Sequence, residues 1–233
     1  MPSLWQKLTA EFLGTFTFIF MAAGSLCADQ YLRAAGQSGL GVLGVALAHG
    51  LAFGIMVTSV SHISGGHLNP AVTIGFWATK RLGTLPSIAY WIAQLLGAVA
   101  ASYLLAAILP ESVWGPAGLG APDLSPEFTR IHGMALEAML TFFLVFVAFA
   151  TLVDARGASR KIAGFASGLT ITVGYLVGNA FTGAAMNPAR ALGAGLVAHR
   201  WQNHGVYWVG PLVGGVLAGF IYDRLYLRDQ PPA

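Results

Sequence analysis

The tripeptide Asn-Pro-Ala occurs twice, at Asn69-Pro70-Ala71 and Asn187-Pro188-Ala189, each time within an apolar stretch. Proline suits the first position of a helix, and asparagine just before it suits the N-cap. Each box therefore predicts the start of a short helix, over residues 72–77 and 190–196, too short to cross a bilayer core of about 30 Å. Non-helical backbone at membrane depth is tolerated only when it is buried in protein or lines a water-filled cavity. Two half-helices that begin inside a membrane thus indicate a pore or a binding site.

The composition predicts an all-α polytopic membrane protein. The 233 residues are 56% hydrophobic and 9% charged, against about 25% charged in soluble domains. Six segments have the length of a spanning helix: Trp5–Cys27, Gly39–Val60, Leu85–Leu109, Met134–Val153, Ile162–Phe181 and Gly205–Tyr226. We expect one channel domain over residues 1–233 and no soluble domain. The basic residues are too scattered to form a nucleic-acid surface.

The positions of the charges predict the orientation. With six spans, both termini share one side with the connections at residues 79–84 and 154–161. That side carries eight of the 12 basic residues: Lys7, Lys80, Arg81, Arg156, Arg160, Lys161, Arg224 and Arg228. The opposite side carries Arg33, Arg130 and Arg200, and Arg190 falls inside the membrane. We therefore expect both termini to be cytoplasmic.

An internal repeat organises the chain. Three pairs of segments match, at offsets of 126, 118 and 117: residues 11–16 with 137–142, 64–71 with 182–189, and 90–97 with 207–214. Each half holds three predicted spans, an odd number, so the halves have opposite orientations. This is an inverted repeat with its site near the midplane, with halves at about 5–110 and 131–228. The segment 110–130, rich in proline, glycine and acidic residues, is the predicted extracellular link.

These features together resemble the aquaporin, or major intrinsic protein, family. They are the two boxes on half-helices, an arginine directly after the second box, and Glu11 and Glu137 at corresponding places. The resemblance covers nearly the whole chain. It implies six transmembrane helices with two re-entrant half-helices, a passive channel for water and small neutral solutes, and a homotetramer in the lipid bilayer. For a prokaryote-like chain it implies the cell (inner) membrane. It implies no enzyme, no cofactor and no metal.

The physical interpretation of the core agrees with this. If the half-helices enter from opposite faces, Asn69 and Asn187 can each cap their own helix and leave an amide N–H for a passing water. The two positive helix ends oppose a cation at the same point. A buried arginine inside a membrane marks a functional path by default, and Arg190 can donate to a solute oxygen while its charge repels cations.

The family places a selectivity filter near this arginine. By motif spacing its members are His49, Tyr175, Ala184 and Arg190. Histidine at the second-helix place resembles plant vacuolar (tonoplast) aquaporins and their ammonia-permeable relatives, which usually have Ile or Val at the fifth-helix place. Tyr175 departs from that pattern. One interpretation is that His49 and Tyr175 exchange the usual aromatic and imidazole and keep a narrow filter; the other is that Tyr175 points into the helix bundle.

The family-like role of Glu11 and Glu137 is to brace the loops before the half-helices, by accepting hydrogen bonds from backbone N–H groups. Loop bracing is also the preferred role for His62 and His67, and a pH-gating role for either stays open. Glycines four residues apart predict close helix contacts: Gly50/Gly54, Gly164/Gly168, Gly210/Gly214 and Gly215/Gly219.

Three functions remain. The first is a water channel that also passes ammonia or another small neutral solute. The second is a glycerol or small-polyol facilitator, whose family pattern has Asp after the second-box arginine and a Gly/aromatic filter with Trp, whereas Ala191, His49 and Ala184 stand here. The third is a structural, low-conductance member, which would have an obstructed lumen.

Overall fold

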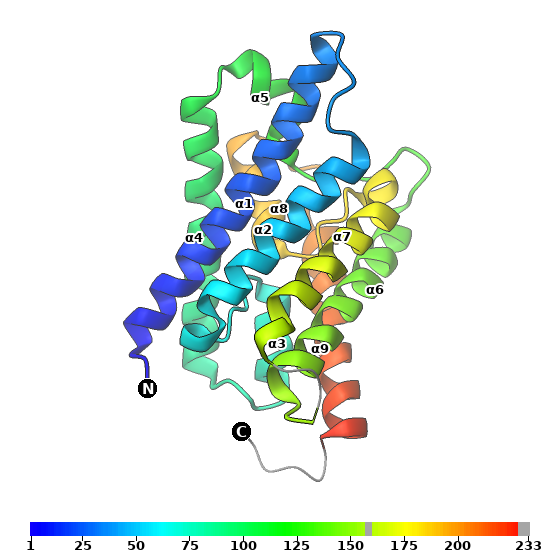
Figure 1. The fold of residues 1–233 in the computed structure, drawn as a ribbon. Helices are drawn as coiled ribbons and strands as arrows, with labels where there is room; N and C mark the ends of the chain where they lie inside the picture. The colour runs from blue at the N-terminus through cyan, green and yellow to red at the C-terminus, as the bar shows by residue number, and fades with distance from the viewer. Residues whose placement is uncertain (157–159, 228–233) are drawn as a thin grey trace.

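The computed structural model describes residues 1–156 and 160–227. Its helices run side by side around two short central helices (Figure 1). In chain order they are α1 (Leu4–Ala34), α2 (Gly41–Ser64), α3 (Pro70–Ala78), α4 (Thr84–Ile108), α5 (Glu111–Ala117), η1 (Gly118–Gly120), α6 (Arg130–Ala148), η2 (Phe149–Val153), η3 (Arg160–Ile162), α7 (Ala163–Thr182), α8 (Pro188–Val197) and α9 (Val206–Tyr226). The short helix α5 and the 3-10 turn η1 lie in the predicted link, and η2 continues α6 as a π-helix.

Five helices of the described chain, α1, α2, α4, α6 with η2, and α9, are long and apolar enough to cross a membrane. The sixth predicted span, Ile162–Phe181, matches the 20-residue helix α7, which is absent from that group. Its glycine, serine and threonine residues and Asn179 lower its mean hydropathy, and several of them lie buried where α7 packs on α2 and α6. The prediction for α1 ended too early, because this helix continues past Cys27 to Ala34.

The short helices α3 and α8 begin at the two boxes, as predicted, and run from the middle of the molecule toward opposite ends (Figure 1). The helix α3 packs against α9, and α8 packs against α4. Each half-helix therefore contacts the last spanning helix of the other half of the chain. This exchange places the N-termini of α3 and α8 next to each other in the core.

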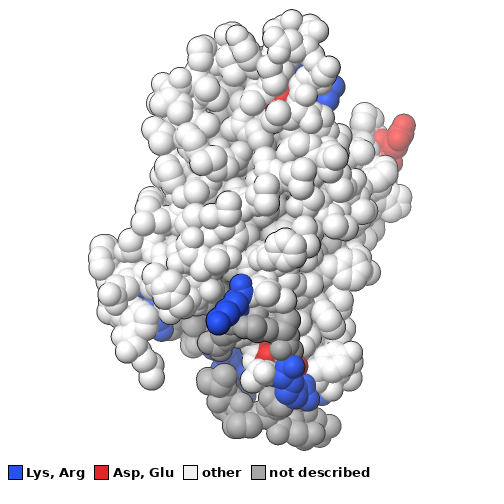
Figure 2. Space-filling view, viewed as in Figure 1, with Lys and Arg blue, Asp and Glu red and all other residues white. Residues whose placement is uncertain are grey.

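Charged side chains gather toward the ends of the molecule, and a broad band between them is uncharged (Figure 2). Large apolar side chains are exposed on the outer faces of the helices, among them Leu51, Ile55, Phe143 and Phe165. Helix α1 begins and α9 ends at one end of the molecule (Figure 1). Of the basic residues assigned to that side, Arg228 and the side chain of Arg160 lie outside the described part of the chain.

A polar cluster fixes that end of α6. The Asp154 carboxylate accepts three hydrogen bonds from Arg156, at 2.9 Å from its backbone nitrogen and 3.0 Å from Nε and Nη2. The Tyr222 hydroxyl on α9 donates a further bond to Asp154 at 3.1 Å. The hydrogen bonds from Arg156 lower the pKa of Asp154 to about 2. The carboxylate is therefore charged throughout the physiological pH range, and it holds η2 against α9.

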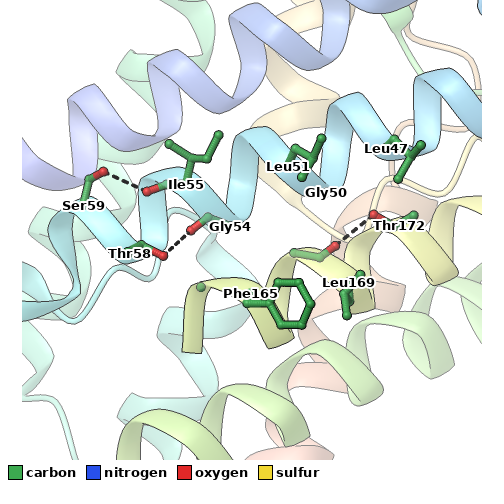
Figure 3. Close-up of a pocket in the computed structure, with 12 residues that line it drawn as sticks. Leu47, Gly50, Leu51, Gly54, Ile55, Thr58, Ser59, Phe165, Leu169 and Thr172 are labelled. Carbon is green, nitrogen blue, oxygen red and sulfur yellow. Dashed lines mark hydrogen bonds between the residues drawn. The ribbon is translucent and has the colours of Figure 1, made fainter. Parts of the chain in front are cut away.

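Helices α2 and α7 approach each other along glycines. A β-carbon on Gly54 would lie 2.6 Å from the Gly164 carbonyl oxygen, and one on Gly168 would lie 2.5 Å from the Gly50 carbonyl oxygen. The outer edge of this contact forms an apolar groove of about 300 Å³, along which Leu51, Ile55, Phe165 and Leu169 lie (Figure 3). The predicted glycine pairs thus lie at real helix contacts. On α9, Gly210 contacts the Met134 carbonyl of α6 and Gly219 contacts the Gly75 carbonyl of α3.

Because backbone fills the space beside Gly54, the substitution Gly54→Ala should separate α2 from α7. We expect it to lower the free energy of unfolding by about 1–3 kcal/mol, the usual cost of overpacking. Gly205→Ala is the matched control, since a β-carbon there meets no atom within 4 Å. Thermal unfolding of the two variants in detergent measures the difference. Equal midpoints would contradict the close contact.

Candidate functional site

The asparagines of the two boxes cap their own half-helices and bond to the opposite loop. Asn69 Oδ1 accepts from the Ala71 nitrogen at 2.8 Å, and Asn187 Oδ1 accepts from the Ala189 nitrogen at 2.9 Å. Their amide nitrogens cross the midplane: Asn69 Nδ2 donates to the Met186 carbonyl at 2.8 Å, and Asn187 Nδ2 donates to the Leu68 carbonyl at 2.9 Å. An amide carries two N–H groups. One N–H of each asparagine therefore remains beyond this cross-link.

The carbonyls that accept these bonds belong to residues with strained backbones. Leu68 has φ 52° and Met186 has φ 50°, in the left-handed region that non-glycine residues rarely adopt. Both are buried and both directly precede a box asparagine. Such strain persists only when the surroundings over-determine it, and it clusters at functional sites. Here the cross-links between the two boxes hold the turn.

Two buried carboxylates hold the loops before the boxes. Glu11 accepts from the backbone nitrogens of His67 at 2.9 Å and Leu68 at 2.7 Å, and Glu137 accepts from those of Ala185 at 2.9 Å and Met186 at 2.7 Å. Each also accepts from a hydroxyl at the end of the preceding helix: Ser64 at 2.6 Å and Thr182 at 2.7 Å. Both glutamates are fully buried. The contacts are those expected of loop-bracing groups.

The first loop has further polar partners that the sequence did not reveal. Gln94 Nε2 on α4 donates to Glu11 at 2.8 Å and to the Thr73 hydroxyl at 2.9 Å, and the Tyr90 hydroxyl donates to the Ser64 carbonyl at 2.8 Å. The available signal was the repeated segment 90–97, which contains both Tyr90 and Gln94.

The two histidines near the first box differ in their surroundings. His67 is buried, with Nδ1 at 3.1 Å from the Thr73 hydroxyl and its ring 4.4 Å from that of Phe76. His62 lies exposed in the last turn of α2. The structure therefore places His67, and not His62, in the bracing network of the first loop.

Three of the four predicted filter residues lie together. The ring centroids of His49 on α2 and Tyr175 on α7 lie 4.4 Å apart, and the Arg190 guanidinium carbon lies 6.0 Å from the centroid of the Tyr175 ring. Ala184, in the second loop, packs against α7 at Gly178, about one turn beyond Tyr175. The Tyr175 ring thus lies beside His49 and Arg190.

Polar atoms of His49 and Arg190 retain unused hydrogen-bonding capacity. His49 Nδ1 lies 2.8 Å from the Val45 carbonyl, and because a carbonyl only accepts, Nδ1 carries the proton and Nε2 is left as an acceptor. Within the described chain, Nε2 is buried without a hydrogen-bond partner, and so is Nη1 of Arg190. The site therefore pairs one acceptor with one cationic donor beside an aromatic ring.

The constriction is narrow. His49, Tyr175 and Ala184 are each 1% exposed, and Arg190 is 4% exposed. Residues lining a wide water-filled pore would show more accessible surface than this. These four side chains therefore leave little accessible surface between them. Among the residues that the structure describes, no group of three metal-ligating side chains is present.

Comparison with known proteins identifies the family. The family model described as major intrinsic protein matches residues 1–222. The chain belongs to the major intrinsic protein family. It is 42% identical to the probable aquaporin TIP3-2 of Arabidopsis thaliana over 99% of this chain and 88% of the relative, and 44% identical to aquaporin TIP4-4 of Zea mays over 96% and 88%. It is 36% identical to aquaporin-4 of Rattus norvegicus over 97% and 69%.

The fold also matches a solved relative. The aquaglyceroporin from Plasmodium falciparum superposes with a TM-score of 0.85 at 26% identity, over 96% of this chain and 97% of that one. The chain is accordingly a multi-pass membrane protein with the aquaporin fold, in which α7 is the sixth spanning helix beside the five more apolar ones. The family consists of channels.

Arg190 carries a positive charge beside the Tyr175 ring, so its removal should loosen solute exclusion. We expect Arg190→Val to raise leakage of protons, cations or urea while water still passes, because both charge and volume leave the narrowest point. Stopped-flow light scattering and a pH-sensitive dye in proteoliposomes measure the two effects. If water flux and exclusion were both unchanged, Arg190 would not line the path.

Proposed function

We propose that this protein is a passive water channel that excludes ions and protons. The observation that carries the proposal is the cross-link at the midplane, where Asn69 and Asn187 cap facing half-helices and bond to each other's loops. The aquaporin names of its relatives support it. The remaining amide N–H of each asparagine donates to the oxygen of a water molecule that passes between them.

Proton exclusion follows from the direction of those donors. A water held by two N–H groups through its oxygen turns both hydrogens away from the midplane, so it cannot accept a proton from one neighbour and pass another along the same line. The positive ends of α3 and α8 raise the energy of any cation at that point. Arg190 adds a second positive charge at the constriction. Water needs neither a charge nor a proton relay to cross.

Ammonia is a second candidate permeant. His49 Nε2, an acceptor that has no partner in the part of the chain described, suits an N–H group as well as a water hydrogen. A glycerol facilitator is less well supported, although an aquaglyceroporin shares the fold. Glycerol is larger than water, and Tyr175 and Arg190 leave little accessible surface at the constriction. A structural member without conduction is the remaining alternative, and flux measurements exclude or establish it.

We propose a single channel domain over residues 1–233, with inverted halves at about 5–110 and 131–228. Basic residues at the end where α1 begins favour cytoplasmic termini, and we place the channel in the cell (inner) membrane. We further propose a homotetramer in the bilayer with one pore in each protomer. The exposed apolar faces of the helices, including the groove between α2 and α7 (Figure 3), provide surface for lipid and for neighbouring protomers.

The purified protein in proteoliposomes should conduct water and carry no ion current. Osmotic shrinkage followed by stopped-flow light scattering should be much faster than in protein-free liposomes of equal size, and planar-bilayer recordings should show no conductance. Shrinkage no faster than in the protein-free control would overturn the proposed function and favour the structural alternative.

The Tyr175 ring should set the size limit for solutes. The wild type should reject glycerol. Tyr175→Ile shortens the side chain beside Arg190, so the permeability of this variant to ammonia, methylamine or urea should rise above that of the wild type. Val173→Ala is the matched control, because Val173 lies on the same helix and is 59% exposed. If Tyr175 served packing alone, the wild type would already pass these solutes, and Tyr175→Ile would mainly lower stability by roughly 1–3 kcal/mol.

A further inference from the structure

Two tyrosines at mirrored places in the repeat have different surroundings. Tyr90 on α4 and Tyr207 on α9 open the matching segments 90–97 and 207–214. The Tyr90 hydroxyl donates to the Ser64 carbonyl at 2.8 Å. The Tyr207 side chain is fully buried, and its hydroxyl has no hydrogen-bond partner in the described protein. A buried hydroxyl without a partner is costly and calls for an explanation.

The two glutamates that bond to these loops differ in the same way, because the one in the first half has more hydrogen-bond partners. Glu11 accepts four hydrogen bonds, the fourth from Gln94, but Pro211 occupies the place of Gln94 in the second half and has no polar side chain. Among the described residues, Glu137 accordingly accepts three, and its Oε2 accepts only from the Met186 nitrogen. One carboxylate oxygen therefore retains capacity for a further donor.

The unpartnered groups of the second half lie around one loop. Tyr207 packs in a small cluster with Ala185 and Ala191, which flank the second box on either side. Ala191 directly follows Arg190, and Glu137 accepts a hydrogen bond from the Ala185 nitrogen. A β-carbon on Gly210, one turn along α9 from Tyr207, would lie 2.8 Å from Glu137 Cβ. Nη1 of the Arg190 guanidinium is buried and, within the described chain, unpartnered. An orphan donor, an orphan hydroxyl and an under-used carboxylate thus lie around the second loop.

We propose that Tyr207 is a positioning residue of the filter, whose hydroxyl and Arg190 Nη1 share one buried water molecule that also reaches Glu137. In the described chain the Tyr207 hydroxyl and Arg190 Nη1 are each left without a partner, and a buried water is the group that can satisfy both. A buried water typically makes two to four hydrogen bonds to otherwise unsatisfied groups. The Tyr207 hydroxyl can donate or accept, Arg190 Nη1 donates, and the Glu137 carboxylate accepts.

The bridging water holds the Arg190 guanidinium in one orientation. This inference rests on the proposed channel function. Arg190 bonds to no carboxylate among the described residues, so its orientation depends on neutral contacts. With the bridge in place, one face of the guanidinium is held toward Glu137 and the remaining N–H groups face the lumen. Without the Tyr207 hydroxyl, the side chain gains freedom to swing, and the constriction widens for part of the time.

The test is Tyr207→Phe, which removes one oxygen and keeps the ring, with Tyr90→Phe as its mirrored control. In proteoliposomes, Tyr207→Phe should raise urea or methylamine permeability relative to water permeability by about two- to ten-fold, the range set by the loss of one hydrogen bond. Tyr90→Phe should lower thermal stability and leave that ratio unchanged. A purely structural role for Tyr207 would instead make both variants less stable and leave both ratios at the wild-type value.

Two further measurements test whether Tyr207 acts through Arg190 and a bridging water. In an Arg190→Val background, Tyr207→Phe should add no further change to the permeability ratio; an additional rise of the same size would overturn the proposal. A crystal structure of the wild type at high resolution should show water density within hydrogen-bond distance of Tyr207 Oη and Arg190 Nη1. Absence of that density overturns the bridge even if the channel conducts. The structural test also stands if no water flux is found, so the two failures are distinguishable.

Discussion

Backbone polar groups inside a bilayer must find partners within the protein, and the rest of this structure depends on how that is done for two short loops. Residues 65–69 and 183–187 leave the helical pattern at the centre of the molecule. Glu11 and Glu137 accept from their N–H groups, while the carbonyls of Leu68 and Met186 accept from the opposite asparagine. Because each asparagine bonds to the other loop, neither half-helix can be positioned without its counterpart.

The repeat supplies this scaffold twice, but the two copies are used differently. In the first half, Gln94, Thr73 and Tyr90 add hydrogen bonds around Glu11 and its loop. In the second half, Pro211 and Ala191 replace Gln94 and Thr73, and polar capacity is left over beside Arg190. Three of the four proposed filter residues, Tyr175, Ala184 and Arg190, belong to this second half, and His49 belongs to the first. The repeat therefore supplies the same scaffold with unequal polar partners.

Much of this fold could be predicted, because its strongest signals are local. Pro70 and Pro188 mark helix starts by their own geometry, and five spans stand out by apolar length alone. The cross-links between Asn69 and Met186, and between Asn187 and Leu68, join residues more than a hundred positions apart, and no local pattern encodes them. Gln94 is also unremarkable as a lone glutamine in an apolar helix. The convergence of His49 and Tyr175 was expected only through family spacing, since neither helix shows by itself which face meets the lumen.

The described side chains along the proposed water path offer few polar groups, and there is a physical reason for this small number. A water molecule that enters a narrow pore loses hydrogen bonds to bulk water, and it must regain some of them for passage to be favourable. Conduction also requires that no site binds too tightly. Asn69 and Asn187 each have one amide N–H committed to a loop carbonyl, so each can offer only one more. At the constriction His49 Nε2 accepts, and Arg190 donates with only part of its guanidinium reaching accessible space. Each of these two places thus replaces one or two of the hydrogen bonds that water makes in bulk, and neither binds the molecule on all sides. In the proposed channel a larger solute would need more replacements than these stages contain, so size and hydrogen-bond supply would exclude it together.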